Sequence, residues 1–361
     1  MDNIQIIKEI LSNIIEPDIR KDLVSADLVK TLELRDETFH VQVSISNPAF
    51  HARKRMHEQI AYQIKKQLGE DFKFELIVSA LPAESELVKR KILPEVKNII
   101  AVASGKGGVG KSTVTANLAG GLAKKGFRVG IVDADIYGPS IPTMFDLVGE
   151  RPEMIDVEGV SKINPIISYG IKILSIGFFT DQDSAVVWRG PMAAKALTQL
   201  FTDAYWGKLD YLLIDLPPGT GDIHLSLVQT VPLDGVVIVS TPQEVALADA
   251  RKGVNMFKLE SINVPIVGLI ENMSWFTPAE LPNNKYYLFG RDGVKNLAEG
   301  INECFLGHIP LVQSVRESGD VGRPAIFQEN AEISKELTQM VERFIEQVQK
   351  IKNKEKEKAT A

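Results

Sequence analysis

The chain has 361 residues, of which 44% are hydrophobic and 24% are charged, and this balance excludes a fibrous or wholly disordered protein. At roughly 100–200 residues per domain, the length predicts two or three domains. The chain has 41 Lys and Arg and 47 Asp and Glu, which gives a net charge of −6. Because nucleic-acid-binding proteins are typically basic, this charge argues against nucleic acid as a main partner. The N-terminus lacks a signal-peptide pattern and no apolar run reaches the roughly 20 residues of a membrane span, so we expect a cytoplasmic protein without a membrane partner.

Residues 1–82 have the pattern of a small α+β domain. Apolar positions spaced by acids and amides predict an amphipathic helix at the N-terminus. The further predicted elements are two strands, a helix and a third strand, at Leu28–Leu34, Phe39–Ile45, Ala52–Leu68 and Phe72–Val78. The charged stretch 83–96 lies between prolines and is predicted to be a linker.

Residues 97–350 show a different pattern, in which short runs of Val, Ile and Leu alternate with helical segments. Such runs are typical of strands buried on both faces of a parallel sheet, and they predict an α/β domain. The predicted strands are Ile99–Ala103, Arg128–Asp133, Tyr211–Asp215, Gly235–Ser240, Ile266–Glu271 and Phe305–Ile309. We expect a last helix over Ile333–Ile351 and a charged, flexible tail at 351–361.

The first of these strands leads directly into a match to the phosphate-binding pattern G-x-x-x-x-G-K-[ST]. Glycines let backbone N–H groups turn toward phosphate oxygens, and the helix that follows presents its positive end to them. Lys111 is expected to contact the β- and γ-phosphates, and Ser112 to bind Mg²⁺. The motif therefore predicts a P-loop NTPase domain. Its nucleotide-binding residues are Gly105, Lys106, Gly107, Gly108, Val109, Gly110, Lys111, Ser112 and Thr113.

The same letters also match the dinucleotide pattern G-x-G-x-x-G through Gly105, Gly107 and Gly110. Asp133, at the end of the next strand, stands where a ribose-binding acid is expected. An oxidoreductase that binds NAD is therefore an alternative. The NAD alternative gives no role to Lys111, Ser112 or Asp215. We therefore favour a nucleoside triphosphate as the ligand.

Three carboxylates, Asp133, Asp135 and Asp215, stand at the ends of two predicted strands, where they suit Mg²⁺ binding and the positioning of water. Lys106 directly follows the first glycine of the loop, and this arrangement resembles the deviant Walker A motif of the MinD, ParA and nitrogenase iron protein class of ATPases. The resemblance implies that Lys106 reaches the nucleotide of a dimer partner. It also implies that Asp135 orients the attacking water with support from Asp133, and that Asp215 holds the metal through water.

The same resemblance gives roles to residues outside the loop. The Pro- and Gly-rich segment Leu216–Asp222 resembles a switch that senses the γ-phosphate, although an ordinary rigid turn would have the same composition. Asn272 and Pro310 stand at the ends of the last two predicted strands. The resemblance implies that these two residues recognise adenine.

Several longer stretches resemble the Mrp/ApbC family of iron–sulfur cluster carrier ATPases. They are DADIYGPSIPTM at Asp133–Met144, VVWRGPM at Val186–Met192, LIDLPPGTGD at Leu213–Asp222, STPQEVALAD at Ser240–Asp249 and ENMSWF at Glu271–Phe276. The N-terminal domain resembles one found in other iron–sulfur assembly proteins. The family implies a homodimer that uses ATP and Mg²⁺, carries a [4Fe–4S] cluster, and transfers it to apoprotein clients in contact with iron–sulfur assembly proteins.

The cysteines depart from the family pattern, in which a C-x-x-C after N-M-S lets a dimer hold one cluster with four thiolates. Here Cys304 is the single cysteine, at the start of a buried strand where a core role is expected. No metal-ligand spacing connects the histidines, which we expect to be exposed or internally hydrogen-bonded; His51 and Glu280 are the remaining candidates. We assign no cluster ligand. The five histidines are His40, His51, His57, His224 and His308.

Two questions stay open at this stage. The aromatic residues around the missing cysteine motif, Trp275, Phe276 and the run Tyr286–Phe289, could form a dimer or client surface or belong to the core. The missing motif also keeps an alternative function open, namely a nucleotide-switched scaffold in cluster assembly or positioning that holds no cluster itself.

Overall fold

The computed structural model describes residues 3–17, 19–35, 38–46, 50–80, 92–179, 190–221, 224, 227–228, 230–328 and 331–360. The chain divides into two compact units, Met1–Leu87 and Val88–Ala361, each with its own hydrophobic core. Most of the predicted linker lies outside the described residues, so the linker stays a prediction. Leu93 is buried in the core of the second unit, which places the chain from residue 92 onward in that unit.

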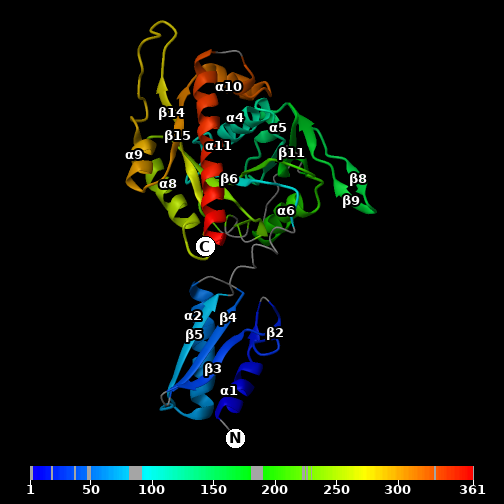
Figure 1. The fold of residues 1–361 in the computed structure, drawn as a ribbon, viewed down its shortest axis with the longest axis vertical. Coiled ribbons are helices and arrows are strands. Elements are labelled where there is room, and N and C mark those ends of the chain that lie inside the picture. Colours follow the sequence, from blue (N-terminus) through cyan, green and yellow to red (C-terminus); the bar gives the residue numbers. More distant parts are fainter. Residues whose placement is uncertain are drawn as a thin grey trace. The chain divides into compact units, whose positions relative to one another are not determined.

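The first unit is a three-stranded sheet packed against helices (Figure 1). Strand β3 pairs antiparallel with β4, and β4 pairs parallel with β5, so the helix α2 crosses over between parallel strands. The last strand starts two residues later than predicted, because Phe72 instead stacks on Phe39 with ring centroids 5.1 Å apart. The elements are α1 (Asn3–Ser12), β1 (Ile15–Glu16), β2 (Lys21–Asp22), β3 (Val29–Arg35), β4 (Thr38–Ile45), α2 (Phe50–Leu68) and β5 (Phe74–Ala80).

The second unit is built on an eight-stranded sheet with the order β10-β11-β7-β12-β6-β13-β14-β15. Its neighbours pair in parallel except for β10 and β11, and every residue of the four central strands β7, β12, β6 and β13 is buried. The strands are β6 (Ile99–Ala103), β7 (Val129–Asp133), β10 (Ile166–Ser168), β11 (Ile171–Ser175), β12 (Tyr211–Asp215), β13 (Gly235–Ser240), β14 (Ile266–Phe276) and β15 (Phe305–Leu311).

All six strands predicted for this domain are present, and the sheet is larger than the prediction. The antiparallel pair β8 (Met154–Val157) and β9 (Val160–Ile163), the edge strand β10 and its neighbour β11 were not predicted. Strands β8, β9 and β10 have four residues or fewer and are largely solvent-accessible, so they lack the continuous apolar run that marks a buried strand. The last two strands also extend beyond their predicted ends.

Helices cover the sheet, and the long helix α11 packs against α4, β14 and β15 (Figure 1). Gly121 allows close approach of α4 and α11, since a Cβ atom there would lie 2.5 Å from Val341. The helices are α4 (Lys111–Lys124), α5 (Ile141–Met144), α6 (Gly190–Thr202), α8 (Glu244–Phe257), α9 (Gly293–Gly300), α10 (Gln313–Asp320) and α11 (Ala331–Thr360), with short 3₁₀ helices η1 (Ile176–Phe179) and η2 (Ala325–Phe327).

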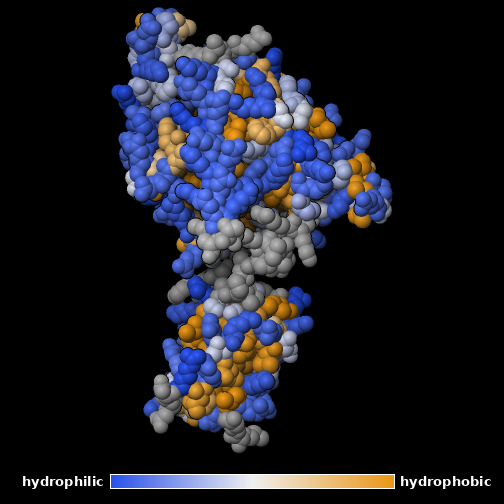
Figure 2. Space-filling view, viewed as in Figure 1, coloured by the Kyte–Doolittle hydropathy of each residue, from blue (hydrophilic) through white to orange (hydrophobic). Residues whose placement is uncertain are grey.

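The last helix was predicted to end at Ile351, but α11 continues to Thr360. This end of the chain consists mostly of Lys, Glu and Ala, which have high helix propensity, and Glu346 pairs with Lys350 one turn earlier at 2.7 Å. Figure 2 shows a hydrophilic outer surface along α11. Within the described ranges, no helix has both the length and the apolar composition needed to cross a membrane.

Candidate nucleotide-binding site

The glycine-rich loop joins β6, at the centre of the sheet, to the first residue of α4. In a doubly wound sheet, ligands bind where the carboxyl ends of the strands face such loops. Gly108 and Gly110 have φ angles of 80° and 82°, a left-handed conformation that glycine adopts without strain. Lys106, Gly107 and Gly108 are exposed, whereas Lys111 at the helix start is buried. The loop therefore presents backbone and one lysine to solvent and directs the second lysine inward.

Gly110 leaves no room for a side chain, because a Cβ atom there would lie 2.2 Å from the Asn272 amide nitrogen. That nitrogen donates a 2.9 Å hydrogen bond to the Val109 carbonyl, so β14 supports the loop directly. Gly105 is equally confined, since its Cβ atom would lie 2.2 Å from the Asp249 backbone in α8. Packing by α8 and β14 therefore fixes the conformation of the loop.

We predict that Gly110→Ala raises the Kd for ATP about tenfold or more, because the loop must shift to relieve both the left-handed strain and the contact with Asn272. Gly126→Ala is the matched control: Gly126 has a φ angle of 84° but has no atom within 4 Å of its Cβ position. Isothermal titration with ATP measures both. Equal affinities for the two variants would contradict the prediction.

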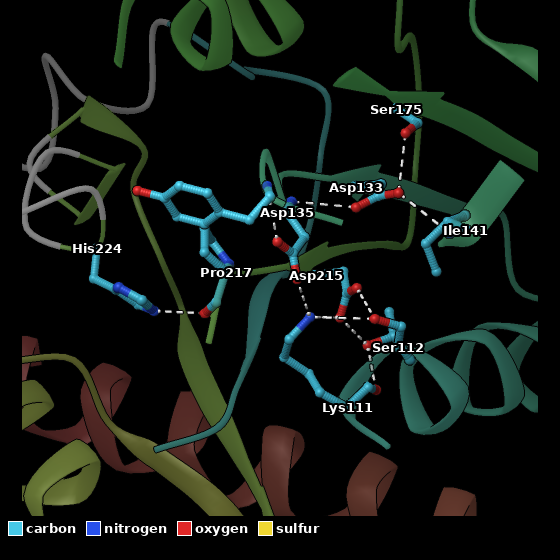
Figure 3. Close-up of polar contacts among 11 residues, drawn as sticks. Lys111, Ser112, Asp133, Asp135, Ile141, Ser175, Asp215, Pro217 and His224 are labelled. Carbon is cyan, nitrogen blue, oxygen red and sulfur yellow. Dashed lines mark hydrogen bonds and ion pairs between the residues drawn. The ribbon is translucent and has the colours of Figure 1, made fainter. Parts of the chain in front are cut away.

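Lys111 lies among the strand-end acids (Figure 3). Its Nζ atom is 2.9 Å from Asp215 Oδ1 and 3.7 Å from Asp135 Oδ2. Ser112 Oγ donates a 2.5 Å hydrogen bond to Asp215 Oδ2. Lys111 is 6% exposed and Asp215 is fully buried, so their attraction acts with little screening by water. The structure thus brings together four residues that the sequence predicted for one site.

Two positioning hydroxyls in this cluster were missed by the sequence analysis. Thr115 Oγ1 donates to Asp215 Oδ1 at 2.8 Å, and Ser175 Oγ donates to Asp133 Oδ2 at 2.9 Å. The spacing of four residues from Lys111 places Thr115 on the same face of α4, and this was an available signal. The sequence held no such signal for Ser175, because Ser175 ends β11, a strand that was not predicted.

Asp133 is directed toward β11 and the chain that follows β7. Besides Ser175, the backbone N–H groups of Asp135 and Ile141 donate to its two oxygens at 3.2 Å. Burial, and next the charge of Asp215, raises the pKa of Asp133 to about 7. Asp133 has no solvent exposure and its oxygens already accept protein hydrogen bonds, so it is not available to a ribose hydroxyl. This geometry argues against the NAD alternative.

Asp135 is closer to Lys111 and keeps some access to solvent. Asp135 is 8% exposed, and the Tyr137 N–H donates a 3.2 Å hydrogen bond to its Oδ1 atom. Burial raises its pKa, while the positive charge of Lys111 acts in the opposite direction. Among the three acids, Asp135 combines partial exposure with proximity to Lys111, which suits a group that must contact water.

The remaining predicted nucleotide residues lie on β14 and β15. Asn272 is buried and, as described, bonds to the loop; its register partner on β15 is Ile309, directly before Pro310. The segment from Leu216 follows β12 over the loop, and its last residue, Asp222, lies outside the described residues. The Gly219 N–H donates to the Ser104 carbonyl at 2.9 Å, which joins the segment to the start of the loop.

The structure provides no complete set of ligands for a metal cluster within the described ranges, where no group of three or more His, Cys, Asp or Glu could hold a metal ion. Cys304 is half-buried against the core, and burial raises the pKa of its thiol. His57 and Glu280 are exposed. The side chain of His51 lies outside the described residues.

The other histidines have internal partners. His40 lies 3.0 Å from Glu75 and His308 lies 3.1 Å from Asp292. His224 bonds to the Pro217 carbonyl at 2.9 Å.

The aromatic segment contains both exposed and buried residues. Trp275 is buried under Lys285, whose Nζ atom is 3.7 Å from the ring centroid. Phe276 and Tyr286 form an antiparallel bridge and are 37% and 42% exposed. Trp275 therefore belongs to the interior, and the exposed rings remain available to a partner.

A strand that runs through a glycine loop into a helix, with a buried lysine and strand-end acids beside it, defines a P-loop NTPase. The family model described as NUBPL iron-transfer P-loop NTPase matches residues 95–347, and the model described as iron-sulfur cluster assembly protein matches residues 4–73. The chain belongs to the NUBPL iron-transfer P-loop NTPase family. The predicted fold class, the predicted family and the predicted ATPase are thereby confirmed.

Similar proteins cover most of the chain. It is 41% identical over 321 residues to the iron-sulfur cluster carrier protein of Synechocystis sp., covering 89% of this chain and 90% of that one. The iron-sulfur cluster carrier protein of Escherichia coli K12 is 41% identical over 320 residues, with 88% and 84% covered.

A solved nucleotide-binding protein from Archaeoglobus fulgidus, in complex with ADP, is 37% identical with a TM-score of 0.58, over 68% of this chain and 95% of that chain. The cell division ATPase MinD of Pyrococcus furiosus, at 22% identity and a TM-score of 0.51, shares the fold over 69% of this chain and 98% of that one.

Proposed function

We propose that this chain is an ATP-hydrolysing iron–sulfur cluster carrier that works as a homodimer and transfers clusters to apoproteins. The observation that carries the nucleotide chemistry is the cluster of Lys111, Ser112, Asp135 and Asp215 beneath the glycine loop. The relatives named as cluster carriers, which share about 40% identity along nearly the whole chain, support the cargo.

The phosphate-binding residues act through backbone and charge. The N–H groups of the loop from Gly105 to Thr113 bind phosphate oxygens at the positive end of α4. Lys111 neutralises charge that develops on the β- and γ-phosphates, and Lys106, exposed on the loop, does the same for the partner protomer's nucleotide. Asn272 and Pro310, on the neighbouring strands β14 and β15, contact adenine.

The site fits Mg²⁺, since it offers a serine hydroxyl and a carboxylate, the hard oxygen ligands that this ion prefers. Ser112 would hold the ion directly and Asp215 through water. When bound, the ion neutralises phosphate charge. Thr115 fixes the rotamer of Asp215 through its hydrogen bond. Asp135 accepts a hydrogen bond from the attacking water and orients it toward the γ-phosphate.

The cluster is cargo, and this chain brings few ligands to it. With one cysteine per chain, a homodimer has two thiols, fewer than the four thiolates that a [4Fe–4S] cluster takes. Cys304 is half-buried with a raised thiol pKa, so it lacks the thiolate character of a ready ligand. The proposal therefore includes thiols supplied from outside the chain, by an iron–sulfur assembly protein or by the client.

Iron and acid-labile sulfide, measured after anaerobic reconstitution with and without ATP, test this proposal. We expect a cluster in the presence of glutathione as the external thiol, and we expect Cys304→Ala to leave the iron content unchanged. Loss of the cluster in Cys304→Ala would make Cys304 a ligand and contradict the external-thiol part. Absence of a cluster under every condition, with ATP hydrolysis intact, would contradict carriage and favour a nucleotide-switched scaffold.

A further inference from the structure

The segment after Asp215 is held against β6 and the start of the glycine loop. The Leu216 N–H donates to the Val102 carbonyl at 3.1 Å, and the Gly219 N–H donates to the Ser104 carbonyl at 2.9 Å. A Cβ atom on Gly107 would lie 3.9 Å from Pro218, which places this proline directly over the loop. Any displacement of the segment would therefore change the surroundings of the phosphates.

The two prolines between these anchor points limit how the segment can be held. Neither Pro217 nor Pro218 has a backbone N–H group, so only their carbonyl groups can bond to the rest of the protein. His224 Nε2 lies 2.9 Å from the Pro217 carbonyl oxygen, and Figure 3 shows the imidazole ring directed at that atom. The contact therefore joins His224 to Pro217.

The protonation state of His224 follows from its surroundings. A carbonyl oxygen can only accept, so Nε2 carries the proton and donates it to this hydrogen bond. The side chain is 2% exposed, and burial, with the charge of Lys111 acting in the same direction, lowers its pKa. His224 is therefore neutral near pH 7 and acts as a fixed donor.

We propose that His224 is a positioning residue for ATP hydrolysis, which holds the Pro217 carbonyl and thereby keeps the segment after Asp215 in place over the glycine loop. It does not touch the nucleotide; it acts through Pro217. Because the loop itself binds the phosphates, loss of this hydrogen bond affects the alignment of the reacting groups more than the binding of ATP. The inference rests on the proposed function only in requiring that the chain hydrolyses ATP.

Steady-state ATP hydrolysis by the full chain tests this role with two substitutions. His224→Leu fills the volume without a donor, and we expect kcat to fall about tenfold with little change in KM. His224→Gln keeps an N–H donor of similar reach, and we expect it to restore most of kcat. His57→Leu, at an exposed histidine of the first unit, is the control and should behave as the wild type.

Thermal unfolding of each variant separates a loss of positioning from a loss of fold. If His224→Leu does not fold, His224→Asn replaces it, since its shorter side chain carries a donor that does not reach the carbonyl. Equal kcat values for the Gln variant and for the variant that lacks the bond would overturn the inference. A wild-type chain without ATP hydrolysis would instead contradict the proposed function.

Discussion

Replacing Lys111 by alanine is expected to lower the rate of ATP hydrolysis about a hundredfold to a thousandfold. Two effects combine. The variant loses the cation that stabilises charge on the transferring phosphoryl group, and it leaves the buried carboxylates of Asp215 and Asp135 without the ammonium that now lies 2.9 Å and 3.7 Å away. A buried carboxylate without a paired cation is unfavourable, so the arrangement of acids that would hold the metal ion is disturbed.

The measurement is phosphate release by the purified chain over a range of ATP concentrations. Lys208→Ala, at an exposed lysine of the same unit, is the control and should retain full activity. Binding of NAD to both variants completes the test, because Lys111 has no role in the dinucleotide alternative. A Lys111→Ala variant that still hydrolyses ATP at the wild-type rate would contradict the proposed site.

The second large effect is expected at Asp133, whose ionisation changes the free energy of unfolding with pH. In the unfolded chain its pKa is near 3.8, whereas in the folded protein it is about 7. Between these values the folded protein keeps a proton that the unfolded chain releases, so the free energy of unfolding falls as the pH rises and levels off above about pH 7. A difference of about three pKa units corresponds to on the order of 4 kcal/mol. Asp133→Asn removes the ionisation, and we expect the nucleotide-free variant to be more stable than the wild type at pH 8.

Urea unfolding at pH 5 and pH 8 measures this difference. Tryptophan fluorescence reports on the second unit alone, since Trp188, Trp206 and Trp275 all belong to it. Asp320→Asn, at an exposed position of the same unit, is the control for the substitution itself. An Asp133→Asn variant that is no more stable than the wild type at pH 8 would show that the folded protein accommodates the ionised carboxylate.

The sequence predicted the elements whose signals are local. The P-loop carries its chemistry within nine adjacent residues, and the central strands are continuous apolar runs because both of their faces are buried. Parallel pairing then requires that the carboxyl ends of β7 and β12 lie at the same edge as the loop, so the meeting of Asp135 and Asp215 with Lys111 could be predicted. The short strands β8, β9 and β10 had no such signal, since they are largely solvent-accessible.

Only the tertiary structure determines the contacts between residues far apart in the sequence. Nothing local indicates that Ser175 orients Asp133, that Asn272 supports Val109, or that His224 bonds to Pro217. Adjacent residues can also have opposite environments, as Trp275 and Phe276 do, because successive side chains of a strand point to opposite faces. The sequence by itself determined which chemistry this chain carries, through motifs in which neighbouring residues act together. The tertiary structure determined how that chemistry is positioned, because long-range packing selects one partner for each buried polar group.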